Sequence, residues 1–305
     1  MSYKYDQDLG GVMRRKSIYA ENIYLNGQQL LNANTPGKVI YVDKNKDGGS
    51  GDGSSWSEAF LTITEAIADA DDYDVIYISH GVYSEAATLN ITQTGLKIFG
   101  SGTSGFIWGP TSLKSDTCKD HLITVNANEV EIAGLDFICN TDEKDAIRVA
   151  TTKDIYKLHI HVCHFGLGTG EYGVYTGATY DSVDMHIDRC EFYNAMTCGV
   201  RMNGTRNKVT NCLFFVPASG IGIEYVPNAE DRPDSFIGHN RFIGSNSSDT
   251  GIKITGSPTA GTYLITDNLV ANCATTITGY AGNDACCVLN YTGSAAGGAL
   301  IDPSP

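Results

Sequence analysis

Histidine and carboxylate side chains recur at fixed offsets within a motif that the sequence uses twice. His159 and His161 stand six and four residues before the last residue of one copy, and His186 and Asp188 stand at the same offsets in the next copy. Residues two apart on a β-strand point to the same face, so these four side chains share one patch if the copies stack. Neutral imidazoles beside a carboxylate can bind a transition metal ion or transfer protons. A solvated polar face is the alternative.

Three acids near this motif could cleave a saccharide. A glycoside hydrolase needs two carboxyl groups about 5 to 9.5 Å apart, and two residues along a strand span about 6.6 Å. Asp184 with Asp188, or Asp188 with Glu191, can therefore fall in this range. If the chain is an enzyme, these acids and His186 are the candidates for catalysis. An acidic protein built from repeated segments offers such pairs by chance, so no catalytic residue is assigned.

Binding without turnover would use other side chains. Exposed aromatic rings can serve as stacking platforms for sugars. Together with His159 and His161, the candidate ligand-binding residues are the tyrosines of one later segment: Tyr172, Tyr175 and Tyr180.

A short acidic segment resembles half of a calcium-binding loop. Asp43, Asn45 and Asp47 alternate with lysines and precede Gly48, as oxygen ligands do in the first half of such a loop. The twelfth position, where a bidentate Glu is expected, is Ser54. An ordinary turn rich in Asp and Asn is therefore favoured, and neither a metal nor another cofactor is expected.

The elements that position these residues follow from a repeat. Segments 158–165 and 185–192 share His, Ile, Cys and Phe at equivalent positions. Including weaker copies, the motif ends 28, 27, 22, 28 and 28 residues apart, at positions 137, 165, 192, 214, 242 and 270. A second set of apolar positions recurs at the same interval, and no helical pattern lies between the copies of the motif. This period predicts a parallel β-helix with coils about 4.8 Å apart; the leucine-rich repeat is excluded because its leucine spacing is missing.

Stacking would turn equivalent positions into columns. One column should face the interior at a turn and hold reduced thiols rather than disulfides: Cys163, Cys190, Cys212, Asn240 and Asn268. Another alternates in charge and should set the register rather than catalyse: Glu129, Lys157, Asp184, Arg206 and Asp234.

The composition and net charge of the chain limit the kinds of partner that we expect it to bind. The chain of 305 residues carries 21 Lys plus Arg against 35 Asp plus Glu, a net charge of −14. Nucleic acid is therefore not expected as a partner, because phosphate binding needs clustered positive charge. No apolar run is long enough to insert into a membrane. The N-terminus lacks the pattern of a signal peptide, so we expect synthesis and folding in a reducing cytoplasm.

Three regions are expected. Residues 1–37 lie outside the repeat and contain Asn26-Gly27 between apolar runs, a strong hairpin signal. An isolated hairpin is barely stable, so this segment should dock to a partner. Residues 38–280 should form the solenoid, beginning with a helix at about 56–70 that covers its open end. Residues 281–305 should cover the far end without adding a coil.

The start of the solenoid resembles a known family. Tyr41-Val-Asp43, the Asp- and Gly-rich loop, the run from Trp56 to Ile67, and Val75-Ile-Tyr-Ile78 occur in the order seen in pectin-lyase-like proteins. The resemblance covers roughly residues 39–280 and implies an all-β, right-handed parallel β-helix. That superfamily includes polysaccharide lyases, glycoside hydrolases, phage tailspikes and virion proteins without known chemistry, so the fold does not choose among these functions.

The resemblance is greatest to phage tailspike and virion β-helices. It implies a structural virion protein, such as a tail spike, a tail fibre, or a head fibre or decoration protein. Such a protein would form a homotrimer at the virion surface, made in the host cytoplasm. Residues 1–37 would bind other virion proteins, and the β-helix would project outward, where it could contact host surface polysaccharide. The alternative is a polysaccharide-degrading hydrolase or lyase on the same fold.

Overall fold

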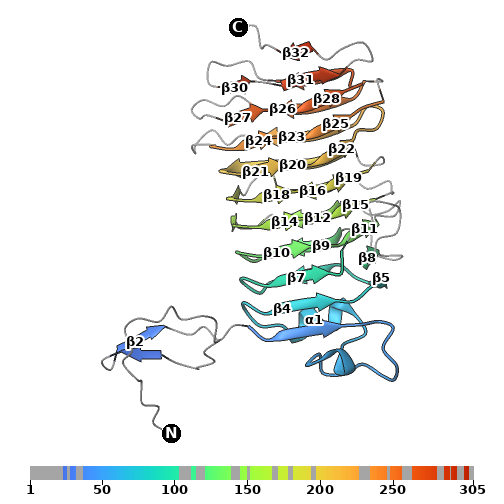
Figure 1. Cartoon of the computed structure of the whole chain (residues 1–305), viewed down its shortest axis with the longest axis vertical. Coiled ribbons are helices and arrows are strands. Elements are labelled where there is room, and N and C mark those ends of the chain that lie inside the picture. The colour runs from blue at the N-terminus through green and yellow to red at the C-terminus, as the bar shows by residue number, and fades with distance from the viewer. Residues whose placement is uncertain are drawn as a thin grey trace, which may run out of the picture. The chain divides into compact units, whose positions relative to one another are not determined.

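A computed structural model gives the arrangement of the chain (Figure 1). It describes residues 23–25, 28–31, 37–102, 111–114, 121–138, 145–149, 152–166, 171–177, 181–193, 197–226, 234–245, 248–255, 263–279, 285–288, 290–293 and 299–301. The chain divides into two compact units, Met1–Pro36 and Gly37–Pro305.

The first unit contains a β-hairpin. Strand β1 (Ile23–Leu25) pairs antiparallel with β2 (Gln28–Leu31), and the predicted turn residues Asn26 and Gly27 lie outside the described residues. The boundary at residue 36 lies one residue before the predicted end of the N-terminal segment. Docking of this segment to a partner stays a prediction.

The second unit is a parallel β-helix with three faces, each of which is one sheet of strands from successive coils (Figure 1). The first sheet consists, in order, of β3 (Val39–Val42), β4 (Val75–Ile78), β7 (Lys97–Gly100), β10 (Glu131–Ala133), β14 (His159–His161), β18 (His186–Asp188), β21 (Lys208–Thr210), β24 (Phe236–Gly238), β27 (Tyr263–Thr266) and β30 (Ala285–Val288).

The other two sheets run in the same direction along the stack. The second sheet consists of β5 (Gly81–Ser84), β8 (Thr111–Lys114), β11 (Asp136–Ile138), β15 (His164–Phe165), β19 (Glu191–Phe192), β22 (Leu213–Phe215), β25 (Arg241–Ile243), β28 (Leu269–Ala271), β31 (Asn290–Gly293) and β32 (Ala299–Ile301). The third consists of β6 (Leu89–Ile91), β9 (His121–Val125), β12 (Asp145–Val149), β16 (Tyr172–Tyr175), β20 (Cys198–Thr205), β23 (Ile221–Val226), β26 (Thr250–Ile254) and β29 (Thr275–Thr278), with β13 (Ile155–Tyr156) and β17 (Ser182–Val183) beside it.

The core is built from identical positions of successive coils. The three-residue strands of the first sheet bury their middle residue, for example Ile132, Ile160 and Ile187, which are paired in register. The phenylalanines that end the motif form a buried stack with ring centroids 4.5 to 4.9 Å apart: Phe137, Phe165, Phe192, Phe214 and Phe242. The repeat read from the sequence is therefore the repeat of the coils.

The turn between the first two sheets has the same form in successive coils. Its first residue adopts the left-handed conformation, with φ between 50° and 68°: Gly134, Val162, Arg189, Asn211, His239 and Asp267. The next residue points inward and belongs to the predicted cysteine and asparagine column, which is buried throughout and is confirmed. In its lower part the thiol of Cys190 donates to the Ile160 carbonyl at 3.7 Å. In its upper part the amide of Asn268 donates to the Ile237 carbonyl at 3.0 Å, so thiol and amide satisfy the same backbone position.

The charged column occupies another turn, before the first sheet, rather than a strand. Its members also adopt the left-handed conformation. Lys157 Nζ lies 2.7 Å from Glu129 Oε1 of the preceding coil, and Arg206 donates two hydrogen bonds of 2.8 Å to Asp184. Exposed pairs of this kind contribute little to stability, which fits a role in register.

The helix near the open end is shorter than predicted. A 3-10 turn, η1 (Trp56–Glu58), precedes α1 (Ile63–Asp69), so 56–70 is not one helix. The reason is that Thr62, in extended conformation, starts the helix with a capping box closed by Glu65. Helix α1 buries Ile63, Ala66 and Ile67 and packs against β3, β4 and β6, the first strands of the stack.

The C-terminal region differs from the expectation that residues 281–305 add no coil. Strands β30 and β31 pair in parallel with β27 and β28, so residues after 281 do extend the stack. Asn290 makes this possible, because its side chain continues the asparagine column and donates to the Ile265 carbonyl at 3.0 Å. Only β32 turns back, pairing antiparallel with β31. Among the described residues, no helix is both long and apolar enough to cross a membrane.

Candidate functional site

The outer face of the first sheet brings the predicted patch together. The parallel register pairs His159 with His186 and His161 with Asp188 on β14 and β18. The coil below, β10, contributes Glu131 directly beside His159. The central isoleucine of each strand points into the core, so the residues on either side of it must point outward. The spatial grouping predicted for the four side chains is confirmed, and their function stays a prediction.

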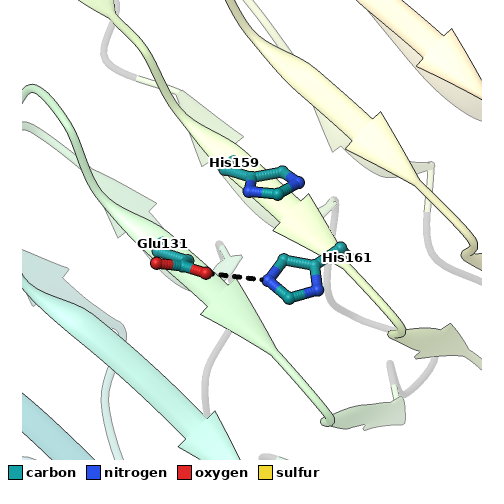
Figure 2. Close-up of side chains that lie close together, drawn as sticks. All are labelled: Glu131, His159 and His161. Atoms are coloured by element: carbon teal, nitrogen blue, oxygen red, sulfur yellow. Dashed lines mark hydrogen bonds and ion pairs between the residues drawn. The ribbon is translucent and has the colours of Figure 1, made fainter. Parts of the chain in front are cut away.

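Glu131, His159 and His161 form what we call the His–Glu cluster (Figure 2). Glu131 lies on one strand and both histidines on the next, with their side chains on the same side of the sheet. His161 Nε2 is 2.9 Å from Glu131 Oε1 and hydrogen-bonded to it. The imidazole of His159 stacks on that of His161, with ring centroids 4.3 Å apart. One potential ligand atom from each residue lies within 4.8 Å of the others.

The pKa values of His159 and Glu131 both lie below their ordinary values. Burial lowers the pKa of His159, and the adjacent His161 and His186 lower it further. Burial opposes ionisation of Glu131, but hydrogen bonds from His161 and Lys97 outweigh it, so the pKa of Glu131 lies below its ordinary value. His159 Nε2 and His161 Nδ1 are shielded from solvent and have no hydrogen-bond partner within the protein. Two ring nitrogens are thus left as potential ligands.

His186 and Asp188 are held by the next coil instead. The ring of His186 stacks on His159 at 5.1 Å, but its Nε2 contacts the hydroxyl of Thr210 at 2.9 Å. Thr210 in turn donates to Asp188 at 2.8 Å, so His186 must be the donor to Thr210. Burial opposes ionisation of Asp188, but hydrogen bonds from Asn211, Thr210 and Arg189 lower its pKa to about 2. This carboxylate carries no proton to give at neutral pH.

The other two candidate acids lie apart from this strand. Asp184 is in the turn before β18, where the guanidinium of Arg206 binds both of its oxygens and lowers its pKa. Glu191 begins β19 of the second sheet, beyond the turn formed by Arg189 and Cys190. The structure thus places Asp184 in a turn, Asp188 on the first sheet and Glu191 on the second sheet, rather than all three on one face.

Two of the candidate tyrosines lie on the third sheet. Tyr175 is paired with Arg148 on β12 and Arg201 on β20, whose guanidinium carbons lie 4.6 and 5.1 Å from its ring centroid. Its two faces are therefore occupied by cations, while Tyr172 leans on its edge with centroids 4.8 Å apart. Tyr180 lies outside the described residues.

The calcium-loop candidate forms a local turn. Asp43 Oδ1 accepts hydrogen bonds from the backbone of Asn45 at 2.9 Å and from Ser79 Oγ at 2.7 Å. The side chain of Asn45 donates to the His80 carbonyl at 3.0 Å, and Asp47 lies in the exposed part of the same loop. The backbone and its neighbours thus use these polar groups.

A second feature of the outer face was not predicted. In the first coils the column that later holds His161 is aromatic: Tyr41, Tyr77 and Phe99 follow one another in register. Trp56 of η1 packs on Tyr41 with centroids 4.8 Å apart. Beside them lies an open groove of about 380 Å³, which we call the aromatic groove, lined by Asp43, Trp56, Tyr77, Ile78, Ser79, His80, Phe99, Gly100 and Ser101.

The sequence contained a signal for this groove. The aromatic residue stands third in each of three strands, in Val39-Ile-Tyr41, Val75-Ile-Tyr77 and Lys97-Ile-Phe99. Aligning these strands by their central isoleucine would have placed the rings in one column. The position of Trp56 could not be read in this way, because a loop brings it to the sheet.

Comparisons with known proteins find distant structural matches. No family model matches the chain, and no curated protein matches it significantly. Among solved structures, a pectin methylesterase in complex with a hexasaccharide matches at a TM-score of 0.49 and 16% identity, covering 76% of this chain and 79% of that one. The Dettilon tailspike protein matches at 0.47 and 14%, covering 84% and 59%. A rhamnogalacturonan lyase matches at 0.44 and 12%, covering 88% and 90%.

These neighbours are an esterase, a tailspike and a lyase on one architecture. At such identities, and with TM-scores below 0.5, neither activity nor biological role follows from them. The parallel β-helix predicted from the sequence is confirmed by the strand pairing itself. Function has to be argued from the site.

Proposed function

We propose that this protein is a structural phage virion component whose β-helix contacts glycan on the host surface. Residues 1–37 would dock to other virion proteins, and the β-helix would project from the particle, at its tail or head, as one subunit of a homotrimer. The division of the chain into two compact units supports this arrangement. An N-terminal segment that forms a separate unit can bind a partner independently of the β-helix.

The aromatic groove carries the glycan part of the proposal. Trp56 is 48% exposed and Tyr77 is 41% exposed, although large aromatic side chains are usually more buried. Sugar rings present C–H faces that pack on aromatic rings, and their hydroxyl groups need polar partners. The groove supplies both, since Asp43, Ser79 and Ser101 line it beside the rings. The Asp43 carboxylate has acceptor capacity beyond the two hydrogen bonds that it accepts from Asn45 and Ser79. Binding sites for small polar ligands combine apolar walls with a few such groups.

Catalysis is less well supported by the same surface. A general acid must keep its proton until the leaving group takes it, which requires a raised carboxyl pKa. Asp188 has a pKa of about 2, and the pKa of Asp184 is also lowered. Both carboxylates are tied to arginines, Arg189 and Arg206. A polysaccharide-degrading enzyme therefore stands as the alternative, with Glu191 as the acid left to test.

The experiment is a binding measurement with host surface polysaccharide. We expect saturable binding to the full chain, and we expect Trp56→Ala and Tyr77→Ala to weaken it at least tenfold, or about 1.4 kcal/mol. Tyr156→Ala is the matched control, since Tyr156 is also a tyrosine 42% exposed but lies on β13 of another face.

The outcome separates the two functions. Undiminished binding by both groove variants would remove the groove from the proposal. Release of oligosaccharides by the native chain, lost in Glu191→Gln or Asp188→Asn, would establish the enzyme instead. Circular dichroism of each variant shows that its fold is intact.

A further inference from the structure

The His–Glu cluster has a donor set unlike the rest of the outer face. His159 and His161 stand two apart on β14, so their rings project from the same side of one strand. Glu131 stands on the adjacent strand, within hydrogen-bond distance of His161. Two imidazoles and a carboxylate from two neighbouring coils thus converge on one point.

The separations suit a small divalent cation. Ligand atoms of a tetrahedral zinc site, with bonds of about 2.0 to 2.2 Å, lie roughly 3.4 Å apart. The atoms offered by the cluster lie within 4.8 Å of one another, and two of them are already 2.9 Å apart. Small side-chain rotations would bring all three onto one ion. No change of backbone is needed, because the strands are already in register.

One ring nitrogen of the cluster also lacks a hydrogen-bond partner. A buried ring nitrogen without a partner is uncommon in proteins, and His159 Nε2 is one, whereas His161 Nε2 already contacts Glu131. A bound cation would give such a nitrogen the partner that the protein does not supply.

We propose that Glu131, His159 and His161 form a binding site for a divalent transition metal ion such as Zn²⁺, Ni²⁺ or Co²⁺, which ties two coils of the β-helix together. Imidazole and carboxylate ligands suit these ions rather than Ca²⁺ or Mg²⁺, which take oxygen. Water would complete the coordination. The site is distinct from the aromatic groove and does not depend on glycan binding.

Two neighbours set the conditions for binding. Lys97 Nζ lies 3.2 Å from Glu131 Oε2 and must move away from an incoming cation. Lys97 is 46% exposed, so solvent is open to its ammonium group. His186 stacks on His159 but is engaged with Thr210. It therefore supports the ring of His159 without serving as a ligand.

The test is a titration of the full chain with Co²⁺ and Zn²⁺, followed by calorimetry, absorption spectroscopy and thermal unfolding. We expect one ion per chain and a melting temperature that rises with metal concentration, since a ligand specific for the folded state stabilises it. His161→Gln and Glu131→Gln should weaken binding at least tenfold. His239→Gln is the matched control, because His239 is an exposed histidine in the turn after β24, outside the cluster, and its loss should leave binding unchanged.

Several results would overturn the site. These are no saturable binding to the native chain, binding by His161→Gln as tight as native, or a cobalt spectrum with sulfur-to-metal charge transfer, which would place the ion on cysteine. If His161→Gln does not fold, His159→Gln tests the same donor set. Circular dichroism without metal verifies the fold of each variant.

Discussion

Asp188 shows how the function of one side chain depends on the coil above it. The sequence offers a carboxylate beside two histidines, the composition of a proton-transfer site. The structure gives that carboxylate three donors from Asn211, Thr210 and Arg189, which fix it in its ionised form. His159 Nε2 and His161 Nδ1 have no hydrogen-bond partner in the protein. These histidines, rather than Asp188, are therefore the candidates for ligand binding.

Acid should destabilise the β-helix through the histidine row. Burial lowers the pKa of His159 and of His186 in the folded chain, so protonation of either ring favours unfolding. Their contribution to stability is fully present above the ordinary histidine pKa of about 6.5 and is lost as pH falls below it. We expect the melting temperature to fall between pH 7 and pH 5.5, and His159→Gln to reduce this slope.

Asp188 provides the matched comparison. Its pKa of about 2 means that its contribution is present above about pH 4 and is lost only in stronger acid. Asp188→Asn should therefore lower the stability at all pH values above 5, by about 1 to 3 kcal/mol. It should not reduce the slope between pH 7 and pH 5.5, because the negative charge of Asp188 opposes the lowering of the His159 and His186 pKa values. An equal slope in native and His159→Gln chains would contradict the assignment to His159.

At the scale of the element, the turn between the first two sheets sets the shape of each coil. Its left-handed residue is Gly134, Asn211 or Asp267 in some coils, which are residues that tolerate this conformation. In the coil of the His–Glu cluster it is Val162, with φ of 50°. A β-branched residue is strained there, so this coil keeps its turn at a cost in stability.

Val162→Asn should therefore stabilise the protein. Val162 is 36% exposed, so the substitution removes little buried apolar area and relieves the strain. We expect the free energy of unfolding in urea to rise by about 1 kcal/mol. Asn211→Val, at the same position two coils later, should lower it by more, because it also removes the hydrogen bond from Asn211 to Asp188. Stability that is unchanged in both variants would mean that the backbone accommodates the branched side chain without strain.

At the scale of the whole molecule, we expect the β-helix to fold without the N-terminal unit. The β-helix has a continuous core that runs from Ile40 to Val270 and draws its members from unit Gly37–Pro305. Deleting residues 1–36 should therefore leave the melting temperature nearly unchanged, and the particle should no longer incorporate the protein. Particle incorporation is measured by comparing purified phage made with the native and the shortened chain. Continued incorporation of the shortened chain would discard the docking role.

Much of the architecture could be predicted from periodic positions. The intervals of 22 to 28 residues between the motif's last residues gave the stack, because coils of similar length must superpose equivalent positions. The buried column from Cys163 to Asn268 and the outer grouping of His159 with His186 followed from the same alignment. Less periodic parts were predicted less well: the helix was expected over 56–70, and residues 281–305 were expected to cover the far end without adding a coil.

The sequence by itself determined the β-helix, its inward and outward columns, and the coincidence of histidines and carboxylates on one face, because a repeat with alternating polarity fixes which residues face the core. Only the tertiary structure decided how those outward groups are used. Arg189, Thr210 and Asn211 neutralise Asp188, Glu131 joins the two histidines, and Trp56 completes the aromatic groove. These contacts depend on side-chain directions and on a loop without a repeat, which no interval in the sequence records.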